Sequence, residues 1–496
     1  MNGPLVSQQI HPPSLELREV GTVTEVKHGI VRANGLPSCI YGQLVDFSDG
    51  ITGMVIGFHP SEAMIIVLGD DRRIHIGDQL ASRSELLRVP VGEAFIGRLV
   101  NCLGNPIDDK GLLVAHDSKP VFRQAAGVME REPITEPFLT GLKVLDLMIP
   151  IGKGQRELIL GDRQTGKTSI ALDAILNQRG KDITCIYCWI GGSFATFKKL
   201  IQILASYQAL SYTLAVCAFA DSSPAEQYLC PYTAATLGES FMSRGRDVLV
   251  VFDDLTRHAW AYRQMSLLME RSPGREAYPG DIFYVHAQLM ERAGRLKAAL
   301  GGGTMTFLPI AETVQGDIAG YIPSNLIAMT DGQIYLSAAL FHEGFKPAID
   351  LGLSVSRIGS KVQSPAMREL SQGLRLGYTQ YRELLRMTRL RTRLSEEAME
   401  QLRKGEALRE LLIQENYQPV SVAQTLVLFY AFKRKILHVL PREALRRFTE
   451  HFFPSLCQHA PALVERLEQA QDLTQDLRGA LDEEFIRFFR TTRPDT

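Results

Sequence analysis

The feature that most constrains the fold is an apolar stretch that runs through a glycine-containing turn into a stretch with apolar residues at helical spacing. It reads ELILGDRQTGKTSIALDAIL, from Glu157 to Leu176. A strand, then Gly-x-x-x-x-Gly-Lys-Thr, then a helix is the signature of a P-loop, whose backbone N–H groups surround the phosphates of a nucleotide. The sequence therefore predicts a nucleotide-binding α/β domain in the centre of the chain.

The positions of this loop have distinct expected roles. Lys167 is expected to reach the β- and γ-phosphates, and the Thr168 hydroxyl to ligate Mg²⁺ at the start of the helix. The alternative, a strand-to-helix turn with accidental glycines, is disfavoured because all signature positions and both flanking elements agree. The residues of the predicted phosphate loop are Gly161, Asp162, Arg163, Gln164, Thr165, Gly166, Lys167 and Thr168.

An acidic position further along the chain completes the motif. The segment DVLVVFDD, residues 247–254, predicts a buried strand that ends in two carboxylates. A P-loop site needs an acid beside its metal ion, and Asp253 is the predicted Mg²⁺ ligand. Asp254 could instead cap the helix that follows. These parts predict binding of ATP or ADP with Mg²⁺, and they leave hydrolysis open.

Charge and hydropathy exclude several classes of function. Lys and Arg total 54 against 55 for Asp and Glu, a net charge of −1, so no global field favours nucleic acid or anionic lipid. The apolar runs are far shorter than the ~20 residues that span a bilayer. Residues 1–20 lack the basic start and continuous apolar core of a signal peptide. We expect a cytoplasmic protein that reaches any membrane through its partners.

The cysteines do not indicate a disulfide framework, because the seven are an odd number spread over a long chain. Cys185 and Cys188 form a CxxC pair, but they lie in the apolar run ITCIYCWI, and no second pair stands at zinc-finger spacing. We expect reduced thiols in a buried strand rather than metal ligands.

The pattern along the chain predicts three domains. Residues 1–90 hold short apolar stretches between turn signals such as Asn34-Gly35, which is typical of a small β-barrel. Residues 91–363 alternate strands with helix-length segments, the pattern of a parallel α/β sheet. Residues 364–496 contain long, charged, leucine-rich stretches with apolar residues at helical spacing, which predict a helical domain.

Five segments carry a family resemblance: GDRQTGKTS (161–169), YRQMSLL (262–268), PGREAYPGDIFYVH (273–286), TDGQIYL (330–336) and GLSVSRIGS (352–360). In this order they resemble the alpha subunit of F-type ATP synthases, from about residue 15 to residue 437 and more loosely to the end. The resemblance implies an N-terminal β-barrel, a central RecA-like α/β domain and a C-terminal helical bundle, in agreement with the three regions above.

The resemblance also implies an assembly. Family members alternate as three alpha and three catalytic beta chains around a rotating gamma stalk, on a membrane sector that carries protons or, in some branches, Na⁺. This chain would then be a peripheral subunit on the cytoplasmic face of the bacterial inner membrane, in a translocating two-sector ATPase. It would bind ATP and Mg²⁺ without turning ATP over, and it would contact no nucleic acid.

The absence of turnover rests on one position. In the related beta subunits, a Glu orients the attacking water. This Glu follows a Gly at the end of the strand that comes after the P-loop helix. Here CIYCWI (185–190) is followed by Gly191, Gly192 and Ser193, so Gly192 stands where the catalytic chain has Glu. Alpha subunits usually have Gln there and a basic residue next. The chain therefore departs from its own family as well, and ordering of water and nucleotide in this pocket is expected to differ.

Arg357 matches the family's arginine finger, which reaches the γ-phosphate held by the neighbouring beta chain. A guanidinium offers planar, permanently charged donors to phosphoryl oxygens, an effect of about 10³ to 10⁵ in rate in comparable enzymes. A lone arginine more often closes a helix or pairs with an acid, but the matching segment favours the finger role. Ser354 and Ser356 are expected to support the geometry of this loop.

The family's adenine pocket is also matched, with changes. Phe341 and Pro347 match its apolar contacts, and Lys346 stands where Arg is usual. Gln414 and Asn416 match two amides that read the base edge, the second being Asn in place of Gln and about 1.5 Å shorter in reach. Inside the P-loop the resemblance implies that Arg163 and Gln164 help to hold the phosphates, although either could be a solvated side chain.

Other segments depart from common alpha chains. Pro12-Pro13 stands where a helix usually docks the peripheral-stalk delta subunit, which argues against delta binding. The segment LGGGTMTFLP from Leu300 replaces a longer insertion and predicts a flexible turn. With these changes the chain resembles a divergent second F-type ATPase that some bacteria have, which is sometimes called N-type. The arginine-rich run from Arg382 to Leu394 is expected to be a solvated helical face, with contact to an acidic partner as the alternative.

Two other classes compete with the non-catalytic subunit. An autonomous hexameric ATPase, such as a secretion motor or an RNA translocase, shares the central fold but needs its own water-orienting Glu, which Gly192 does not supply. A purely structural subunit that has lost nucleotide is allowed by Lys346 and Asn416, but Lys167, Thr168 and Asp253 argue against it.

Overall fold

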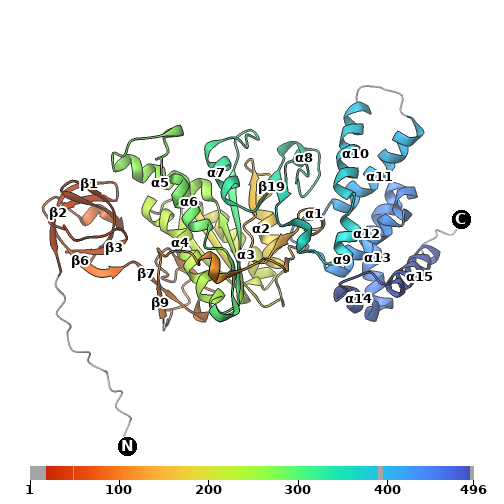
Figure 1. The fold of residues 1–496 in the computed structure, drawn as a ribbon, viewed down its shortest axis with the longest axis horizontal. Helices are drawn as coiled ribbons and strands as arrows, with labels where there is room; N and C mark the ends of the chain where they lie inside the picture. Colours follow the sequence, from red (N-terminus) through yellow and green to blue (C-terminus); the bar gives the residue numbers. More distant parts are fainter. Residues whose placement is uncertain (1–17, 49, 116, 389–394, 492–496) are drawn as a thin grey trace, which may run out of the picture.

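The computed structural model describes residues 18–48, 50–115, 117–388 and 395–491. Its three parts lie in a row: an N-terminal β-barrel, a central α/β domain and a C-terminal helical domain (Figure 1). The predicted fold class is confirmed. The exact domain boundaries stay predictions, and Pro12-Pro13 and residues 389–394 of the arginine-rich run lie outside the described residues.

The barrel is closed, with strand order β1-β2-β5-β4-β3-β6. Its interior is filled by alternate, fully buried residues such as Val31, Val45, Val55 and Ile65, as the period of two of a strand requires. The strands are β1 (Val20–Lys27), β2 (Ile30–Asn34), β3 (Gln43–Phe47), β4 (Thr52–His59), β5 (Glu62–Leu68) and β6 (Gln79–Leu86).

The centre of the α/β domain is a sheet in the order β20-β19-β13-β18-β16-β14-β15-β8, parallel from β19 to β8. Helices cover both faces, so the inner strands are continuous apolar runs. The strands are β8 (Leu99–Asn101), β13 (Leu158–Gly161), β14 (Ile183–Gly192), β15 (Thr213–Phe219), β16 (Asp247–Asp253), β18 (Thr304–Glu312), β19 (Gly332–Leu336) and β20 (Val355–Ser356). The helices are α1 (Lys143–Met148), α2 (Lys167–Leu176), α3 (Phe194–Ser206), α4 (Pro224–Met242), α5 (Leu255–Leu268), α6 (Ile282–Met290), α7 (Tyr321–Met329) and α8 (Ala338–His342).

Short strands complete the connections of this domain. A two-stranded ribbon follows the barrel, and the turn predicted at Leu300 packs against the end of α4, where a Cβ on Gly301 would lie 2.3 Å from the Ser243 carbonyl oxygen. These strands are β7 (Arg88–Val91), β9 (Asp117–Pro120), β10 (Arg131–Glu132), β11 (Pro137–Phe138), β12 (Ile151–Gly152) and β17 (Gly294–Leu296).

The C-terminal domain is helical, as predicted from its 3.6-residue periodicity. One hydrophobic core runs from α2 of the central domain into this bundle and joins Leu172 and Ile175 to Leu426 and Phe429. The helices are α9 (Pro365–Ser371), α10 (Leu374–Thr388), α11 (Glu396–Leu412), α12 (Val422–Lys433), α13 (Arg442–His459), α14 (Pro461–Glu468) and α15 (Gln475–Thr491).

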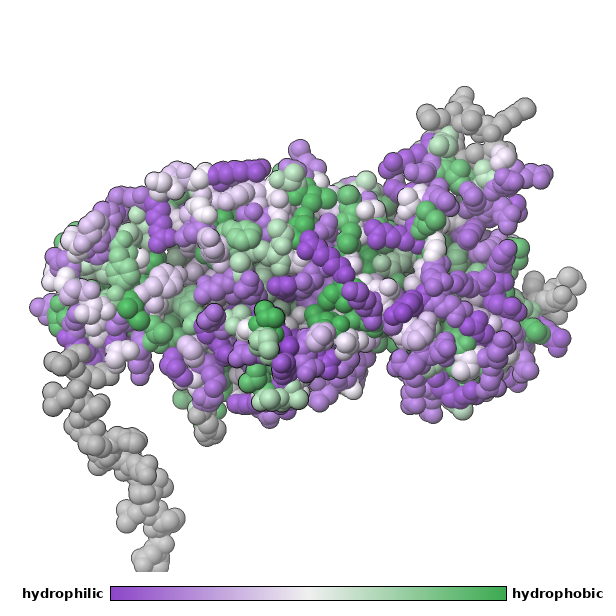
Figure 2. Space-filling model, viewed as in Figure 1, coloured by the Kyte–Doolittle hydropathy of each residue, from purple (hydrophilic) through white to green (hydrophobic). Residues whose placement is uncertain are grey.

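The visible surface is mixed: hydrophilic residues cover most of it, and hydrophobic residues occur in small groups, several over the central domain (Figure 2). Within the described ranges, no helix is both long enough and apolar enough to cross a bilayer. Cys185 and Cys188 are fully buried in β14, and neither is in a disulfide. The expectation of buried strand thiols is confirmed.

Candidate nucleotide-binding site

A cavity of about 400 Å³ lies where the carboxyl ends of the central strands meet the N-terminus of α2 and the loop after α11. Its volume is in the range of sites for small ligands, and its position is where parallel α/β sheets bind ligands. The predicted site residues that line it are Gln164, Thr165, Gly166, Lys167, Thr168, Asp253, Phe341, Pro347, Gln414 and Asn416.

The P-loop presents the start of α2 to this cavity. Gly166 precedes the helix with a φ of 101°, a left-handed conformation that glycine adopts without a steric penalty. The Lys167 ammonium donates to the carbonyl oxygens of Gly161 (2.8 Å) and Asp162 (2.7 Å). Burial lowers the pKa of Lys167, while surrounding carboxylates oppose this effect. A cation and the N–H groups at the start of α2 therefore face the same space, which suits an anionic ligand.

Three residues of the predicted phosphate loop do not line the cavity. The Asp162 carboxylate accepts hydrogen bonds from the Thr313 hydroxyl (2.7 Å) and the Gly316 N–H (2.9 Å), which fixes the loop to the turn after β18. Arg163 is exposed and pairs with Glu312 at 2.9 Å. Gly161, Asp162 and Arg163 therefore belong to the loop but not to the cavity wall. That these residues hold the phosphates stays a prediction.

The metal end of the cavity joins α2 to β16. The Thr168 hydroxyl and the Tyr187 hydroxyl both donate to Asp253 Oδ2, at 2.8 and 2.6 Å. Burial raises the pKa of Asp253, and these hydrogen bonds oppose the shift. A hydroxyl and a carboxylate oxygen are suitable ligands for Mg²⁺, which keeps most of its water and phosphate ligands. The pair Thr168 and Asp253 therefore fits the predicted Mg²⁺.

Asp254 has the capping role that the sequence left open. Its carboxylate accepts from the Arg257 N–H at 2.8 Å at the start of α5. Burial, together with the charge of Asp253, raises the pKa of Asp254 to about 7. Asp254 is therefore a helix cap within the cavity wall.

Another part of the cavity wall comes from the segment that follows β19. Phe341 and Pro347 line the cavity there, and the Lys346 ammonium lies 4.9 Å from the centre of the Phe341 ring, a cation–π contact. Lys346 therefore turns toward the ring that is predicted to contact the base.

The two amides of the cavity wall differ in their surroundings. Gln414 is buried, donates to the carbonyl oxygens of Gly141 (2.7 Å) and Gln418 (2.9 Å), and accepts from the Lys143 N–H (3.1 Å). Its amide thus holds the loop together, and Asn416 is the exposed amide at the rim.

Sequence reasoning missed several residues of the cavity wall. Trp189 and Arg257 line it next to Gly192, and Glu312 and Asp173 line it elsewhere. Asp173 lies on α2 four residues after Ser169, which also lines the cavity, so the helical period could have indicated it. The position of Trp189 had no comparable signal.

The arginine loop lies outside this cavity. Ser354 Oγ donates to the Asp350 carbonyl oxygen at 2.6 Å, and Ser356 Oγ donates to the Pro150 carbonyl oxygen at 2.7 Å. Arg357 follows directly and is exposed. The two serines tie the loop to the domain, and the guanidinium is placed away from the chain's own predicted phosphate site.

Comparison with known proteins agrees with this layout. Residues 16–81 match the β-barrel domain of the ATP synthase alpha/beta family, residues 141–356 its nucleotide-binding domain, and residues 363–488 its C-terminal domain. ATP synthase subunit alpha of Clostridium acetobutylicum is 44% identical over 479 residues, which cover 96% of this chain and 95% of the relative. The subunit of Petrotoga mobilis is 44% identical, with 96% of each chain covered, and that of Clostridium botulinum 43%, with 96% and 95%. The chain therefore belongs to the ATP synthase alpha/beta family, among its alpha subunits.

Proposed function

We propose that this chain is a non-catalytic subunit that binds Mg²⁺-ATP or ADP at its own P-loop and supplies Arg357 to a neighbouring catalytic beta subunit. The observation that carries this proposal is Gly192, which ends β14 in the cavity wall without a side chain to orient water. A P-loop site that hydrolyses ATP needs a carboxylate or an amide at such a position.

The other acids of the cavity support the absence of turnover. Asp254 is held as the cap of α5, and Glu312 is held by Arg163 at 2.9 Å. Asp253 already accepts two hydrogen bonds at the predicted metal position. Asp173 accepts from the Tyr417 N–H at 2.7 Å. Each of these four carboxylates thus has a structural or metal-binding role. Mg²⁺, when bound, would neutralise phosphate charge, and Lys167 and the N–H groups of α2 would orient the phosphates.

The arginine loop supports a role in a neighbouring site. Arg357 is exposed on a loop fixed by Ser354 and Ser356, and Arg375 on α10 donates to the Ser354 carbonyl oxygen at 2.9 Å. An exposed guanidinium on a rigid loop is suited to a phosphate on another chain. Exposed apolar residues such as Val128 (88%) and Met129 (80%) are consistent with a surface that a partner covers.

The wider proposal follows from the family. The chain would alternate with beta subunits in a hexamer of three alpha and three beta chains around a gamma stalk, attached by a peripheral stalk to a membrane sector at the cytoplasmic face of the bacterial inner membrane. The complex would couple ATP synthesis or hydrolysis to H⁺ or Na⁺ transport. The coupling ion is a property of the membrane ring rather than of this chain.

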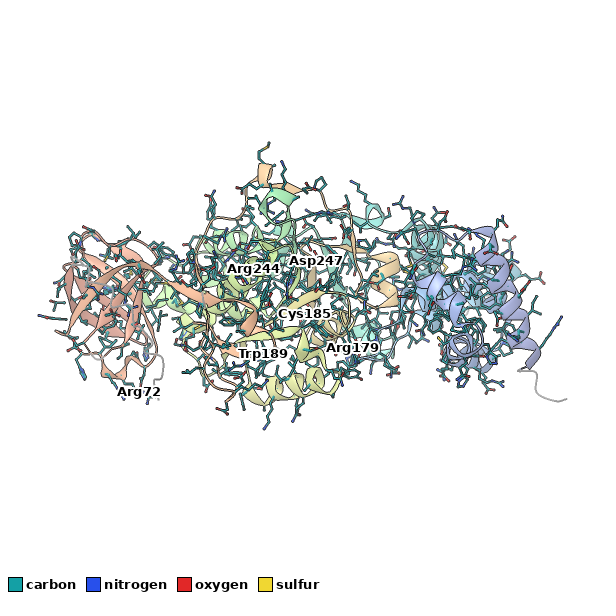
Figure 3. The ribbon with its side chains drawn as sticks, turned by 90° about the horizontal axis from the view of Figure 1, so that it is seen from below. Arg72, Arg179, Cys185, Trp189, Arg244 and Asp247 are labelled. Atoms are coloured by element: carbon teal, nitrogen blue, oxygen red, sulfur yellow. The ribbon has the colours of Figure 1, made fainter. Side chains whose placement is uncertain are left out.

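The test is Arg357→Ala in the assembled alpha–beta complex. We expect ATP hydrolysis by the complex to fall by about 10³-fold or more, since an arginine finger contributes that much, while the purified chain binds Mg²⁺-ATP as before. Arg72→Ala is the matched control, because that side chain is 88% exposed and lies on the N-terminal barrel (Figure 3), whereas Arg357 follows β20 of the central domain. Unchanged hydrolysis in the Arg357 variant would refute the finger role.

A further inference from the structure

Trp189 is the largest side chain in the wall of the nucleotide cavity that the proposed function leaves without a role. It lies on β14, in the interior of the central domain with Cys185 (Figure 3), and only 7% of it is exposed. Its ring packs against Tyr187 and Phe197, with centroids 6.5 and 5.9 Å away. Two aromatic neighbours therefore pack against the indole.

The indole fills the space beside Gly192. A Cβ built on Gly192 would lie 2.1 Å from Trp189 Cζ2 and 2.7 Å from Nε1, which is closer than atoms can approach. The two residues meet because β14 has an irregularity between Ile190 and Gly192, where Gly191 has a φ of 62°. Such a bulge brings together side chains that a regular strand would place on opposite faces. Trp189 and Gly192 are thus a matched pair.

The indole nitrogen has no hydrogen-bond partner within the described residues. Trp189 Nε1 is buried, and no hydrogen-bond acceptor within the described residues reaches it. A buried donor without an acceptor is destabilising, so each such group in a native protein needs an explanation, such as a functional role or a bound water or ion. An indole N–H can only donate. The acceptor that is missing is therefore expected to be an oxygen that enters the cavity.

The position of the indole indicates which part of a ligand this oxygen belongs to. Trp189 is the cross-strand partner of Asp253, whose carboxylate accepts from Thr168. Both line the same cavity as Phe341 and Pro347. A nucleotide with its base against Phe341 and its phosphates at the P-loop would bring its terminal phosphate to the part of the wall formed by Asp253 and Trp189.

We propose that the Trp189 N–H donates a hydrogen bond to an oxygen of the terminal phosphate of a bound nucleoside triphosphate. This inference rests on the proposed nucleotide binding and deepens it. The Trp189 indole fills the space that a side chain at residue 192 would occupy. Because an indole cannot accept a proton from water, it favours retention of a bound triphosphate over its hydrolysis. The site thus distinguishes ATP from ADP by a donor that ADP does not reach.

The test compares Trp189→Phe with the parent chain by calorimetric titration. Phe keeps most of the ring and removes the N–H, so we expect affinity for Mg²⁺-ATP to fall by about tenfold and affinity for Mg²⁺-ADP to change less than about threefold, as a hydrogen bond to a charged group predicts. The chain has two tryptophans, and Trp260, 38% exposed on α5, is the matched control. Trp260→Phe should bind both nucleotides like the parent and should leave Trp189 emission as a reporter that responds to ATP more than to ADP.

A second variant tests whether the effect of Trp189→Phe comes only from lost packing of the indole. Gly192→Ala keeps the indole but displaces it through the predicted clash, so it should lower ATP affinity selectively too. Equal losses for ATP and ADP, or no loss in either variant while the parent binds both nucleotides, would overturn the inference and leave nucleotide binding intact. Failure of the parent chain to bind either nucleotide would overturn the proposed function, and this inference with it.

Discussion

The Thr168 hydroxyl donates a 2.8 Å hydrogen bond to the Asp253 carboxylate and thereby joins the first turn of α2 to the end of β16. The two oxygens are held together before any ligand enters. Preorganised hydroxyl and carboxylate oxygens are suited to a cation that accepts few protein ligands. The proposed role of Mg²⁺ can therefore be tested by changing one of these two side chains.

Asp253→Asn should weaken binding of ATP in the presence of Mg²⁺ by about tenfold, since an amide is a poorer ligand for Mg²⁺ than a carboxylate. Binding of ADP in the presence of a chelator should hardly change. Titration of both nucleotides with and without Mg²⁺ measures the difference. Equal weakening with and without Mg²⁺ would show that Asp253 acts through the fold rather than through the metal.

Lys167→Gln should lower ATP affinity by about 10- to 100-fold, because a charge-assisted hydrogen bond to phosphate is lost. The folded chain should persist, since the hydrogen bonds of the Lys167 ammonium within the described residues go to two carbonyl oxygens of its own loop. Lys198→Gln, at an exposed position of α3, is the control for loss of one positive charge. A similar loss of affinity in both variants would contradict a specific role for Lys167.

Asp173 makes the stability of the chain depend on pH. Burial raises its pKa from 3.8 to about 7, and the Tyr417 N–H, which donates to it at 2.7 Å, only partly opposes this. The folded state therefore binds more protons than the unfolded state between these values. The contribution of Asp173 to stability is present below about pH 4 and is lost as pH rises through about 7.

Asp173→Asn should therefore stabilise the chain at about pH 8 by on the order of 2 kcal/mol and have little effect near pH 4. The Asn oxygen can still accept from the Tyr417 N–H. Urea denaturation at both pH values measures the difference, and Asp109→Asn at an exposed turn is the control. A stabilisation that does not depend on pH would refute the titration of Asp173.

Arg375 is predicted to position the arginine loop. Arg375→Ala removes the 2.9 Å hydrogen bond to the Ser354 carbonyl oxygen and should lower hydrolysis by the assembled complex by about tenfold, less than Arg357→Ala does. Nucleotide binding by the isolated chain should not change. If the two variants were equally inactive, Arg375 would contact the substrate or hold the interface itself.

The sequence predicted the elements whose patterns are local. The P-loop of Lys167 and Thr168, the acid at the end of β16 and the amphipathic helices beyond residue 364 each follow from spacing within one segment. The family resemblance added the residues of the base end, such as Phe341 and Pro347, which come from a distant segment and which the structure brings into the same cavity.

The sequence could not predict relationships that depend on side-chain packing between segments. The pairing of Arg163 with Glu312 and the use of the Gln414 amide within its own loop arise only when the chain is folded. The meeting of Trp189 with Gly192 depends on a strand irregularity that periodicity does not reveal. In each case the sequence gives the residue type, but it does not indicate which residue of another segment it contacts.

Binding of Mg²⁺-ATP and release of phosphate, followed in one sample of the purified chain, decide whether this subunit is catalytic. We expect tight binding, abolished in Lys167→Ala, with no release of phosphate above the rate without protein. Phosphate release by the isolated chain that disappears in Lys167→Ala would contradict a non-catalytic site, because another group in the cavity would then orient water in place of the side chain that Gly192 lacks.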